Sequence, residues 1–287
     1  MSTANSPYFL ESLQKILFTI LYTSSVREAV PVSAVLVGDS GTAKSKLLMS
    51  LVGESIHLTD SFTSTGLFDL MKNDQQNKLH WIITPDMNPT LCRRPSTVVS
   101  TVSNLLSLTM DGTCRVDDGR SDKIAKHNPI GFLSAMTPDI YAKQAKKWLS
   151  LGLRRRIIPL FFTYSRETID KLLAVQREDK ISGANFPSFI FSPTGTLKPI
   201  INQVMSLHIQ AHGATFASNL GLEKGKDREG KQKWYLKNVM PISPISTLRT
   251  LARAHALMAK RPEVNEEDIT FLGSFIDFTN QSNPKQL

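Results

Sequence analysis

Short apolar runs recur through the first half of the chain, and polar or glycine-containing residues follow each of them. Runs of this length that are rich in valine and isoleucine are typical of buried β-strands. They occupy residues 35–37, 56–58, 79–83, 130–136 and 157–161. Before them, residues 8–24 predict an amphipathic helix with an apolar face formed by Leu10, Leu13, Ile16, Leu17 and Ile20.

One helix and one hairpin are predicted between the later runs. Residues 97–108 have apolar positions at helical spacing. Residues 109–119 alternate between apolar and polar side chains and contain two Asp-Gly pairs, which predicts a β-hairpin.

Helical patterns dominate the chain beyond residue 163. Helices are predicted over residues 166–178 and 197–217, and a third begins at Ser243–Pro244, an N-cap followed by an N1 proline. Residues 264–269 open a last helix. Between these helices, residues 187–193 predict an ordered connection, and the charged residues 223–233 predict a solvated loop.

A candidate phosphate-binding loop follows the first apolar run. The sequence Gly38-Asp-Ser-Gly-Thr-Ala-Lys-Ser45 lies between a predicted strand and a predicted helix, which is the context of a P-loop. Backbone N–H groups and the helix N-terminus would meet the phosphates, Lys44 adds a positive charge, and the Ser45 hydroxyl can ligate Mg²⁺. Ala43 replaces the last glycine of the usual pattern, and an ordinary strand–turn–helix connection is the alternative. The predicted nucleotide contacts are Gly38, Asp39, Ser40, Gly41, Thr42, Ala43, Lys44 and Ser45.

This loop resembles the variant P-loop of the minichromosome maintenance (MCM) helicases, which belong to the AAA+ superfamily. Their pattern is Gly-Asp-Pro-Gly/Ser-x-Ala-Lys-Ser, in which alanine before the lysine is normal. The resemblance implies that the chain binds ATP and Mg²⁺. The Ala-His-Ala segment and the Val264–Ile269 turn also resemble the lid of MCM and MoxR-type ATPases.

A second stretch, residues 79–88, is an apolar run that ends in an acid. This is the Walker B pattern, in which the acid holds Mg²⁺. AAA+ proteins follow that aspartate with a glutamate, whereas here Asp86 stands alone and Met87 follows it. Asp86 therefore takes either the place of the metal-binding acid or the place of the acid that orients water. The alternative is that Asp86 caps the helix after it.

The position of the hairpin resembles the pre-sensor 1 hairpin of MCM-like proteins, which contacts DNA. Arg115, Arg120, Lys123 and Lys126 lie on or beside it and suit phosphate contacts. A solvated basic hairpin without a ligand is the alternative interpretation. After the next predicted strand, Thr137 occupies the position of the family's sensor 1 residue.

Residues 152–161 resemble the arginine-finger region of MCM proteins. The alignment of the apolar run places Arg156 on the finger, with Arg155 and Arg154 as close alternatives. The finger reaches the nucleotide of a neighbouring subunit, where it stabilises charge on the phosphoryl group. A basic cluster at a helix end is the alternative. Ile245 stands where the lid's sensor 2 arginine is expected, and Arg249 is the nearest substitute.

Net charge, cysteine content and the length of the apolar runs indicate which partners and which cellular compartment to expect. The formal net charge of +9 favours a polyanionic partner. Two cysteines, Cys92 and Cys114, are too few for a disulfide framework or a cysteine-based zinc site. No apolar run approaches the length of a membrane span and no signal peptide is evident, so we expect a cytoplasmic protein without a membrane partner.

Together these features predict an α/β P-loop domain with a parallel sheet over residues 1–163, followed by an all-helical lid over residues 164–287. The expected function is that of an ATP-binding AAA+ protein, an ATPase that assembles as a ring or helical filament, a hexamer by analogy, and acts on DNA as a motor or targeting switch. A separate targeting or effector protein is expected as a partner. The alternatives are a MoxR-like protein-remodelling chaperone and a nucleotide-dependent scaffold that hydrolyses weakly.

Overall fold

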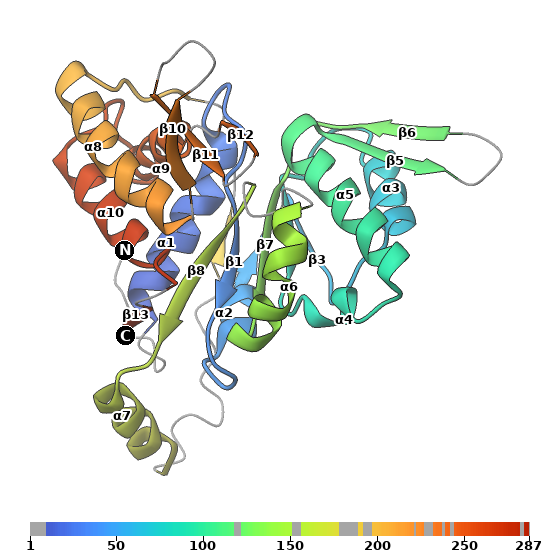
Figure 1. The fold of residues 1–287 in the computed structure, drawn as a ribbon, viewed down its shortest axis with the longest axis horizontal. Helices are drawn as coiled ribbons and strands as arrows, with labels where there is room; N and C mark the ends of the chain where they lie inside the picture. The colour runs from blue at the N-terminus through green and yellow to red at the C-terminus, as the bar shows by residue number, and fades with distance from the viewer. Residues whose placement is uncertain are drawn as a thin grey trace.

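A computed structural model shows a sheet with helices on both faces (Figure 1). It describes residues 10–117, 122–150, 156–177, 189–191, 197–220, 222–226, 232–236, 239–241, 244–281 and 284–286. No helix within these ranges is long and apolar enough to cross a membrane.

The central sheet has six strands in the order β13-β8-β1-β7-β4-β3, and every neighbouring pair is parallel. Five of them are the predicted apolar runs, and the sixth, β13 (Lys285–Gln286), adds an edge strand from the end of the chain. The five are β1 (Ser33–Val37), β3 (Ile56–Leu58), β4 (Trp81–Thr84), β7 (Gly131–Met136) and β8 (Ile157–Thr163). The predicted parallel α/β architecture is therefore confirmed.

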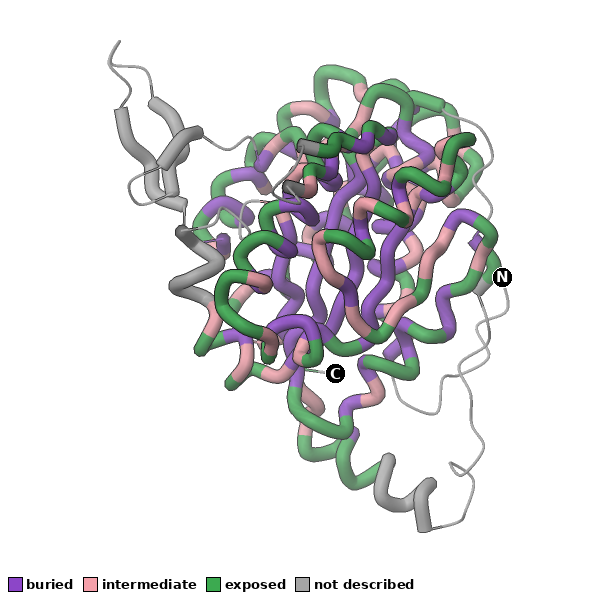
Figure 2. The backbone as a smooth tube through the Cα atoms, turned by 90° about the vertical axis from the view of Figure 1, so that its right-hand side faces the viewer, coloured by how far each residue is buried: buried purple, intermediate pink, exposed green. Residues whose placement is uncertain are grey.

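Each face of the sheet is buried against a different set of helices, which explains why its strands are continuously apolar. Along β1, Ala34 and Leu36 join a cluster with α1 (Glu11–Tyr22) and the C-terminal helices. Val35 and Val37 join a second cluster with α3 (Ser64–Asn73) and α5 (Pro95–Asp111). Figure 2 shows the buried strands between exposed helical layers.

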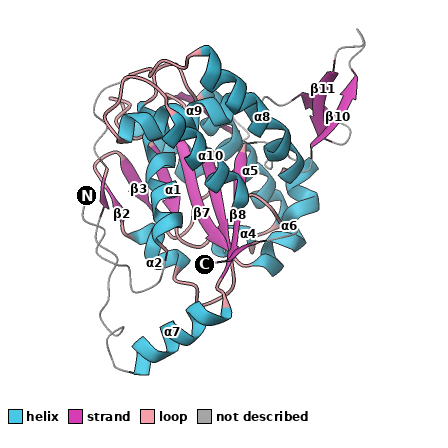
Figure 3. Cartoon of the chain, turned by 90° about the vertical axis from the view of Figure 1, so that its left-hand side faces the viewer, coloured by secondary structure: helices cyan, strands magenta, loops and turns pink. Residues whose placement is uncertain are grey.

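Three helices of the second half pack with α1 on one face: α8 (Gln203–Asn219), α9 (Pro244–Met258) and α10 (Glu266–Asp277). Figure 3 shows them grouped over that side of the sheet. Buried residues of all three helices share one apolar cluster with β1, β7 and β8. Residues on both sides of position 163 thus contribute to the same core.

The expectation of an all-helical second half is wrong, because strands also form there. β10 (Leu222–Lys226), β11 (Gln232–Leu236) and β12 (Val239–Pro241) make an antiparallel sheet. The charged residues predicted as a solvated loop supply most of β10 and the start of β11. The error has a physical reason: the β-favouring Trp234 and Tyr235 directly follow the charged run and pair with Lys224 and Glu223.

The remaining elements are short or connect the main ones. They are η1 (Thr23–Ser25), α2 (Lys44–Met49), β2 (Leu51–Val52), α4 (Asn88–Leu91), β5 (Thr113–Asp117), β6 (Asp122–Lys126), α6 (Pro138–Ser150), α7 (Arg166–Arg177) and β9 (Phe189–Ile190). The predicted helix over residues 197–217 begins later, at Gln203, because the Asn202 side chain caps it by accepting from the Met205 N–H at 2.9 Å.

A buried carboxylate fixes the turn between α9 and α10. Asp268 is fully buried; it lies 2.6 Å from His255 Nδ1 and accepts from both terminal nitrogens of Arg261 at 2.9 and 2.7 Å. Burial alone would raise the pKa of Asp268, but the hydrogen bonds from His255 and Arg261 lower it below its usual value. The carboxylate thus stays charged and holds α9 in position.

Gly131 is required by close packing across the sheet. A Cβ at this position would lie 2.1 Å from Trp81, a fully buried ring on the paired strand. We expect Gly131→Ala to lower the free energy of unfolding by about 1–3 kcal/mol or more, because neither strand can move away. Chemical denaturation measures this change.

Gly273 provides the matched control. It lies inside α10, and the nearest atom to an added Cβ is 3.9 Å away. Gly273→Ala should raise stability by about 0.5–1 kcal/mol through helix propensity. Equal effects of the two substitutions would contradict the packing described for β4 and β7.

Candidate functional site

The predicted site residues converge at one edge of the sheet. Because β1, β4 and β7 are parallel, the loops that leave their carboxyl ends meet there. They surround a cavity of about 600 Å³, a volume in the range of small-molecule sites. Its lining comprises Ser40, Gly41, Thr42, Ala43, Lys44, Ser45, Lys46, Pro85, Asp86, Asn88, Ala135, Met136, Thr137 and Ile140. We call this cavity the P-loop pocket.

The loop that follows β1 turns through two left-handed residues. Gly41 has φ +82°, and Ala43 has φ +56° immediately before α2. Ala43 thus adopts a conformation that costs a non-glycine residue about 1–2 kcal/mol. The position where the usual pattern has glycine is therefore one where the backbone favours it. Because α2 has six residues, its dipole contributes little, and the charge of Lys44 dominates the loop.

Lys44 is buried beneath the loop. Its Nζ donates to the Gly38 carbonyl at 2.7 Å, to the Asp39 carbonyl at 2.5 Å and to Thr42 Oγ1 at 3.1 Å. Burial lowers the pKa of Lys44 below the usual lysine value, and the carboxylates of Asp39 and Asp86 oppose this shift. The loop is therefore closed around a desolvated cation that has carbonyl and hydroxyl acceptors.

Ser45 and Asp86 meet on the opposite wall. The Ser45 hydroxyl donates to the Pro85 carbonyl at 3.0 Å, which links α2 to the end of β4. Asp86 is exposed, and its Oδ1 accepts from the Asn88 N–H at 2.9 Å at the start of α4. Asp86 thus bonds to the first residue of α4, whereas Met87 occupies the N-cap position without a side-chain cap bond; Asp86 also lines the pocket.

Asp86 is the only carboxylate among the described lining residues. Asp39 turns away, because its carboxylate accepts from Thr163 Oγ1 at 3.2 Å. Thr137, the predicted sensor 1 residue, lies at the end of β7 and lines the pocket as expected. Sequence reasoning missed Asn88, whose position two residues after Asp86 was the available signal.

Of the predicted arginines that the structure describes, Arg156 and Arg249 do not line this pocket within one chain. Arg156 precedes β8, and with Arg249 it lines a second cavity at the amino ends of the strands. β1 has five residues, which at about 3.3 Å per residue separates the two edges by about 16 Å. Arg249 instead donates to Ser206 Oγ at 3.0 Å. Arg154 and Arg155 lie outside the described residues.

A basic hairpin forms, but further along the chain than the predicted residues 109–119, because residues 109–111 end α5 and Gly112 is its left-handed C-cap. The hairpin presents two different faces. β5 and β6 pair so that Arg115 lies opposite Ile124 and Thr113 opposite Lys126, all on one face. Arg115 and Lys126 are exposed. Lys123 is also exposed but lies on the other face, which further along buries Cys114 and Ala125. Arg120 falls outside the described residues.

The hairpin is attached to α5 by one buried side chain. Asn104 donates from Nδ2 to the Arg115 carbonyl at 2.7 Å and accepts from the Arg115 N–H at 3.1 Å. Sequence reasoning did not identify this residue, because an asparagine inside an apolar helix face has no distinguishing pattern. The two bonds fix the direction in which the hairpin leaves the domain.

The residues present fit a nucleoside triphosphate with a divalent cation. Lys44 supplies a cation beside the loop, Ser45 offers a hydroxyl and Asp86 a carboxylate, which are oxygen donors suited to Mg²⁺. No group of three or more acidic, histidine or cysteine side chains in the described ranges could hold a metal alone. A cation here would therefore depend on phosphate oxygens as well as on Ser45 and Asp86.

No protein-family model matches the chain, and no curated protein matches its sequence. The site is therefore interpreted from its own geometry.

The lowered pKa of Lys44 predicts a pH dependence of phosphate binding. Protonated Lys44 attracts the anion, so affinity should fall as pH rises through a pKa below the ordinary 10.5. Titrations with a fluorescent ATP analogue from about pH 7.5 to about pH 10 measure this decline. Lys44→Arg, which stays charged over that range, should decline less. Parallel profiles for the two proteins would contradict the role given to Lys44.

Proposed function

We propose that the chain binds ATP with Mg²⁺ in the P-loop pocket and that nucleotide binding controls its assembly and its contact with DNA. One observation carries the proposal: Lys44, Ser45 and Asp86, which come from two separated segments, line one cavity at the carboxyl ends of parallel strands. Ligands of open α/β sheets bind at this edge.

The roles of the residues follow from their chemistry. Loop N–H groups and Lys44 bind and orient the phosphates, while Ser45 and Asp86 hold the cation, directly or through water. When bound, the cation neutralises charge that develops on the phosphoryl group. Thr137 can donate a hydrogen bond toward the same space. The hydrogen bond from Ser45 to the Pro85 carbonyl makes the metal ligands of both segments move together.

Hydrolysis by a single chain is expected to be slow. Asp86 is the one carboxylate among the described lining residues, and the Asn88 N–H already engages it. A single carboxylate cannot both hold the cation and orient the attacking water. We therefore propose a nucleotide-dependent switch or scaffold as the second candidate, with efficient turnover only where a partner completes the site.

A neighbouring copy is proposed to complete the site. Arg156 lies at the opposite edge of the sheet from the P-loop, so it can act on nucleotide only in another subunit. An interface that joins the amino edge of one sheet to the carboxyl edge of the next is head-to-tail, and repetition gives a ring or a filament. This arrangement supports the predicted oligomer, and a separate effector protein would act on it.

Loss of the Lys44 charge tests nucleotide binding. Lys44→Ala should weaken ATP affinity by about tenfold or more, because a charge-assisted contact to phosphate is lost. Isothermal titration calorimetry with Mg²⁺ present measures the change. Lys72→Ala, at an exposed position in the last turn of α3, is the matched control and should bind as the unmodified chain does. Equal affinities for the two variants would refute the proposed site.

Substitutions on the two faces of the hairpin test whether the hairpin contacts DNA. Arg115→Gln combined with Lys126→Gln should reduce the slope of log affinity against log salt by about 2, because two phosphate contacts are lost. Lys123→Gln, on the other face, should leave that slope nearly unchanged. Fluorescence anisotropy with a labelled duplex over about 50–200 mM salt gives both values. Equal slopes for all three proteins would exclude the Arg115 face from DNA binding.

A further inference from the structure

A second cavity, larger than the P-loop pocket, is separate from it. Its volume is about 790 Å³, and it lies where β1 and β8 begin, between the sheet and α9. It shares no lining residue with the P-loop pocket. An inference drawn from it therefore goes beyond the proposed nucleotide site. We call it the basic cavity.

Positive charge predominates in the basic cavity. Glu28 is the one carboxylate among the described lining residues. Five basic side chains also line the cavity: Arg27, Arg156, Lys198, Arg249 and Arg253. Glu28 is already engaged, with Lys198 Nζ at 2.5 Å and Arg27 Nε at 3.8 Å. Glu28 also attracts Arg253, so one carboxylate is shared among Arg27, Lys198 and Arg253 in a cavity that five basic side chains line.

Arg249 and Arg253 are each held in place by a hydrogen bond to an uncharged acceptor. Arg249 donates to Ser206 Oγ at 3.0 Å, and Arg253 donates from Nε to the Pro199 carbonyl at 3.1 Å. Both acceptors are uncharged, and each bond uses one of five guanidinium donors. The two arginines stand one turn apart on α9, where like charges repel. Burial and the charge of Arg249 lower the pKa of Arg253, and the charge of Glu28 opposes this shift.

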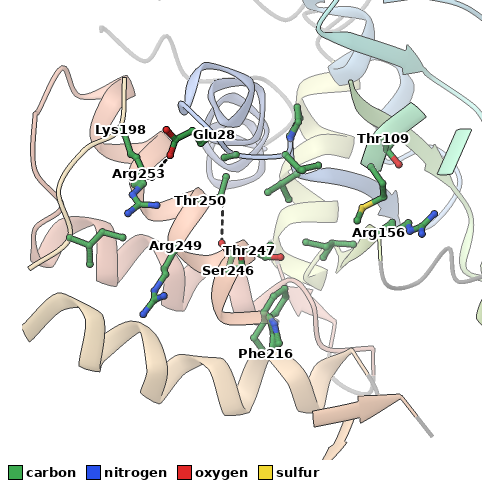
Figure 4. A pocket seen from close by; sticks show the side chains of 18 of the residues that line it. Glu28, Thr109, Arg156, Lys198, Phe216, Ser246, Thr247, Arg249, Thr250 and Arg253 are labelled. Atoms are coloured by element: carbon green, nitrogen blue, oxygen red, sulfur yellow. Dashed lines mark hydrogen bonds and ion pairs between the residues drawn. The ribbon is translucent and has the colours of Figure 1, made fainter. Parts of the chain in front are cut away.

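The arrangement is visible in Figure 4. Arg253 lies beside the Lys198–Glu28 pair, Arg249 lies one turn away, and Arg156 lies across the cavity near Thr109. Ser246 and Thr247, in the first turn of α9, also line the cavity, and that turn contains no acidic residue. The rest of the wall is apolar and includes Val32, Ile158, Ile201, Phe216 and Leu220.

We infer that the basic cavity is a second anion site, which takes the phosphate groups of a polyphosphate ligand. Preoriented guanidinium groups match phosphate oxygens in pairs, and the hydroxyls of α9 add further donors. The phosphate groups can belong to a free polyphosphate or nucleotide, or to a nucleotide held in the P-loop pocket of a second copy. In both cases Arg249 and Arg253 make the principal contacts.

The experiment uses inorganic triphosphate as the probe and the Lys44→Ala chain as the background, so that the P-loop pocket does not contribute. Binding is measured by isothermal titration calorimetry. If the cavity takes a free ligand, triphosphate binds the Lys44→Ala chain saturably, and adding Arg249→Gln with Arg253→Gln weakens it by at least about tenfold. Arg166→Gln, which removes one arginine charge at an exposed position at the start of α7, is the control and should have no effect.

If the ligand is a nucleotide held by a second copy, triphosphate does not bind the Lys44→Ala chain. In that case ATP promotes self-association of the otherwise unmodified chain in sedimentation velocity, and the Arg249→Gln, Arg253→Gln chain loses this response while it still binds ATP. Either result supports the inference that the basic cavity binds phosphate. The inference is overturned if the double substitution changes neither triphosphate binding nor ATP-dependent self-association.

Glu28→Gln gives a readout of opposite sign that does not depend on the arginine variants folding. Glu28 is exposed and is the one carboxylate in the described lining, so its removal should raise the affinity of the cavity for phosphate or strengthen ATP-dependent association. Unchanged or weaker values would count against the site. Failure of ATP binding by the unmodified chain, with triphosphate binding retained in Lys44→Ala, would refute only the P-loop proposal.

Discussion

Parallel pairing of β1 between β7 and β8 is the constraint on which the rest of the molecule depends. It buries both faces of the central strand, and it brings the ends of β1, β4 and β7 to the same edge. The pairing of the strands thus brings Lys44 and Asp86, which are distant in sequence, to the same pocket. The fully buried Trp81 against Gly131 fixes the spacing of the next pair of strands.

The same sheet separates two kinds of electrostatic environment. At the carboxyl edge a single buried lysine is balanced by loop carbonyls and lies near Asp86. At the amino edge several arginines line a larger cavity with one carboxylate among its described residues. The asymmetry follows from the strand directions. It makes one edge suited to holding a nucleotide and the other suited to receiving phosphate from outside the chain.

Sequence patterns identified five strands of the central sheet, because each contains a short apolar run, whereas the edge strand β13 is polar and gave no such signal. The loop after β1 was also predictable, since its residues are contiguous. The hairpin was predictable only in part, because the first of the two Asp-Gly pairs, Asp111–Gly112, ends α5 instead of forming a hairpin turn. Features that depend on tertiary contacts were not predictable. They are the two hydrogen bonds between Asn104 and Arg115, and the gathering of Arg27, Arg249 and Arg253 from separate segments. The antiparallel strands β10–β12 were missed because local charge obscured the β-favouring residues that follow.

The central claim is that the P-loop pocket holds ATP with Mg²⁺, and a crystal structure with a non-hydrolysable ATP analogue and Mg²⁺ tests it most directly. The account predicts phosphate density against the loop of residues 38–45 within reach of Lys44, and a cation between the phosphates and Ser45 on the Asp86 side. Absence of nucleotide from that pocket at saturating analogue, or nucleotide bound only in the basic cavity, would contradict it.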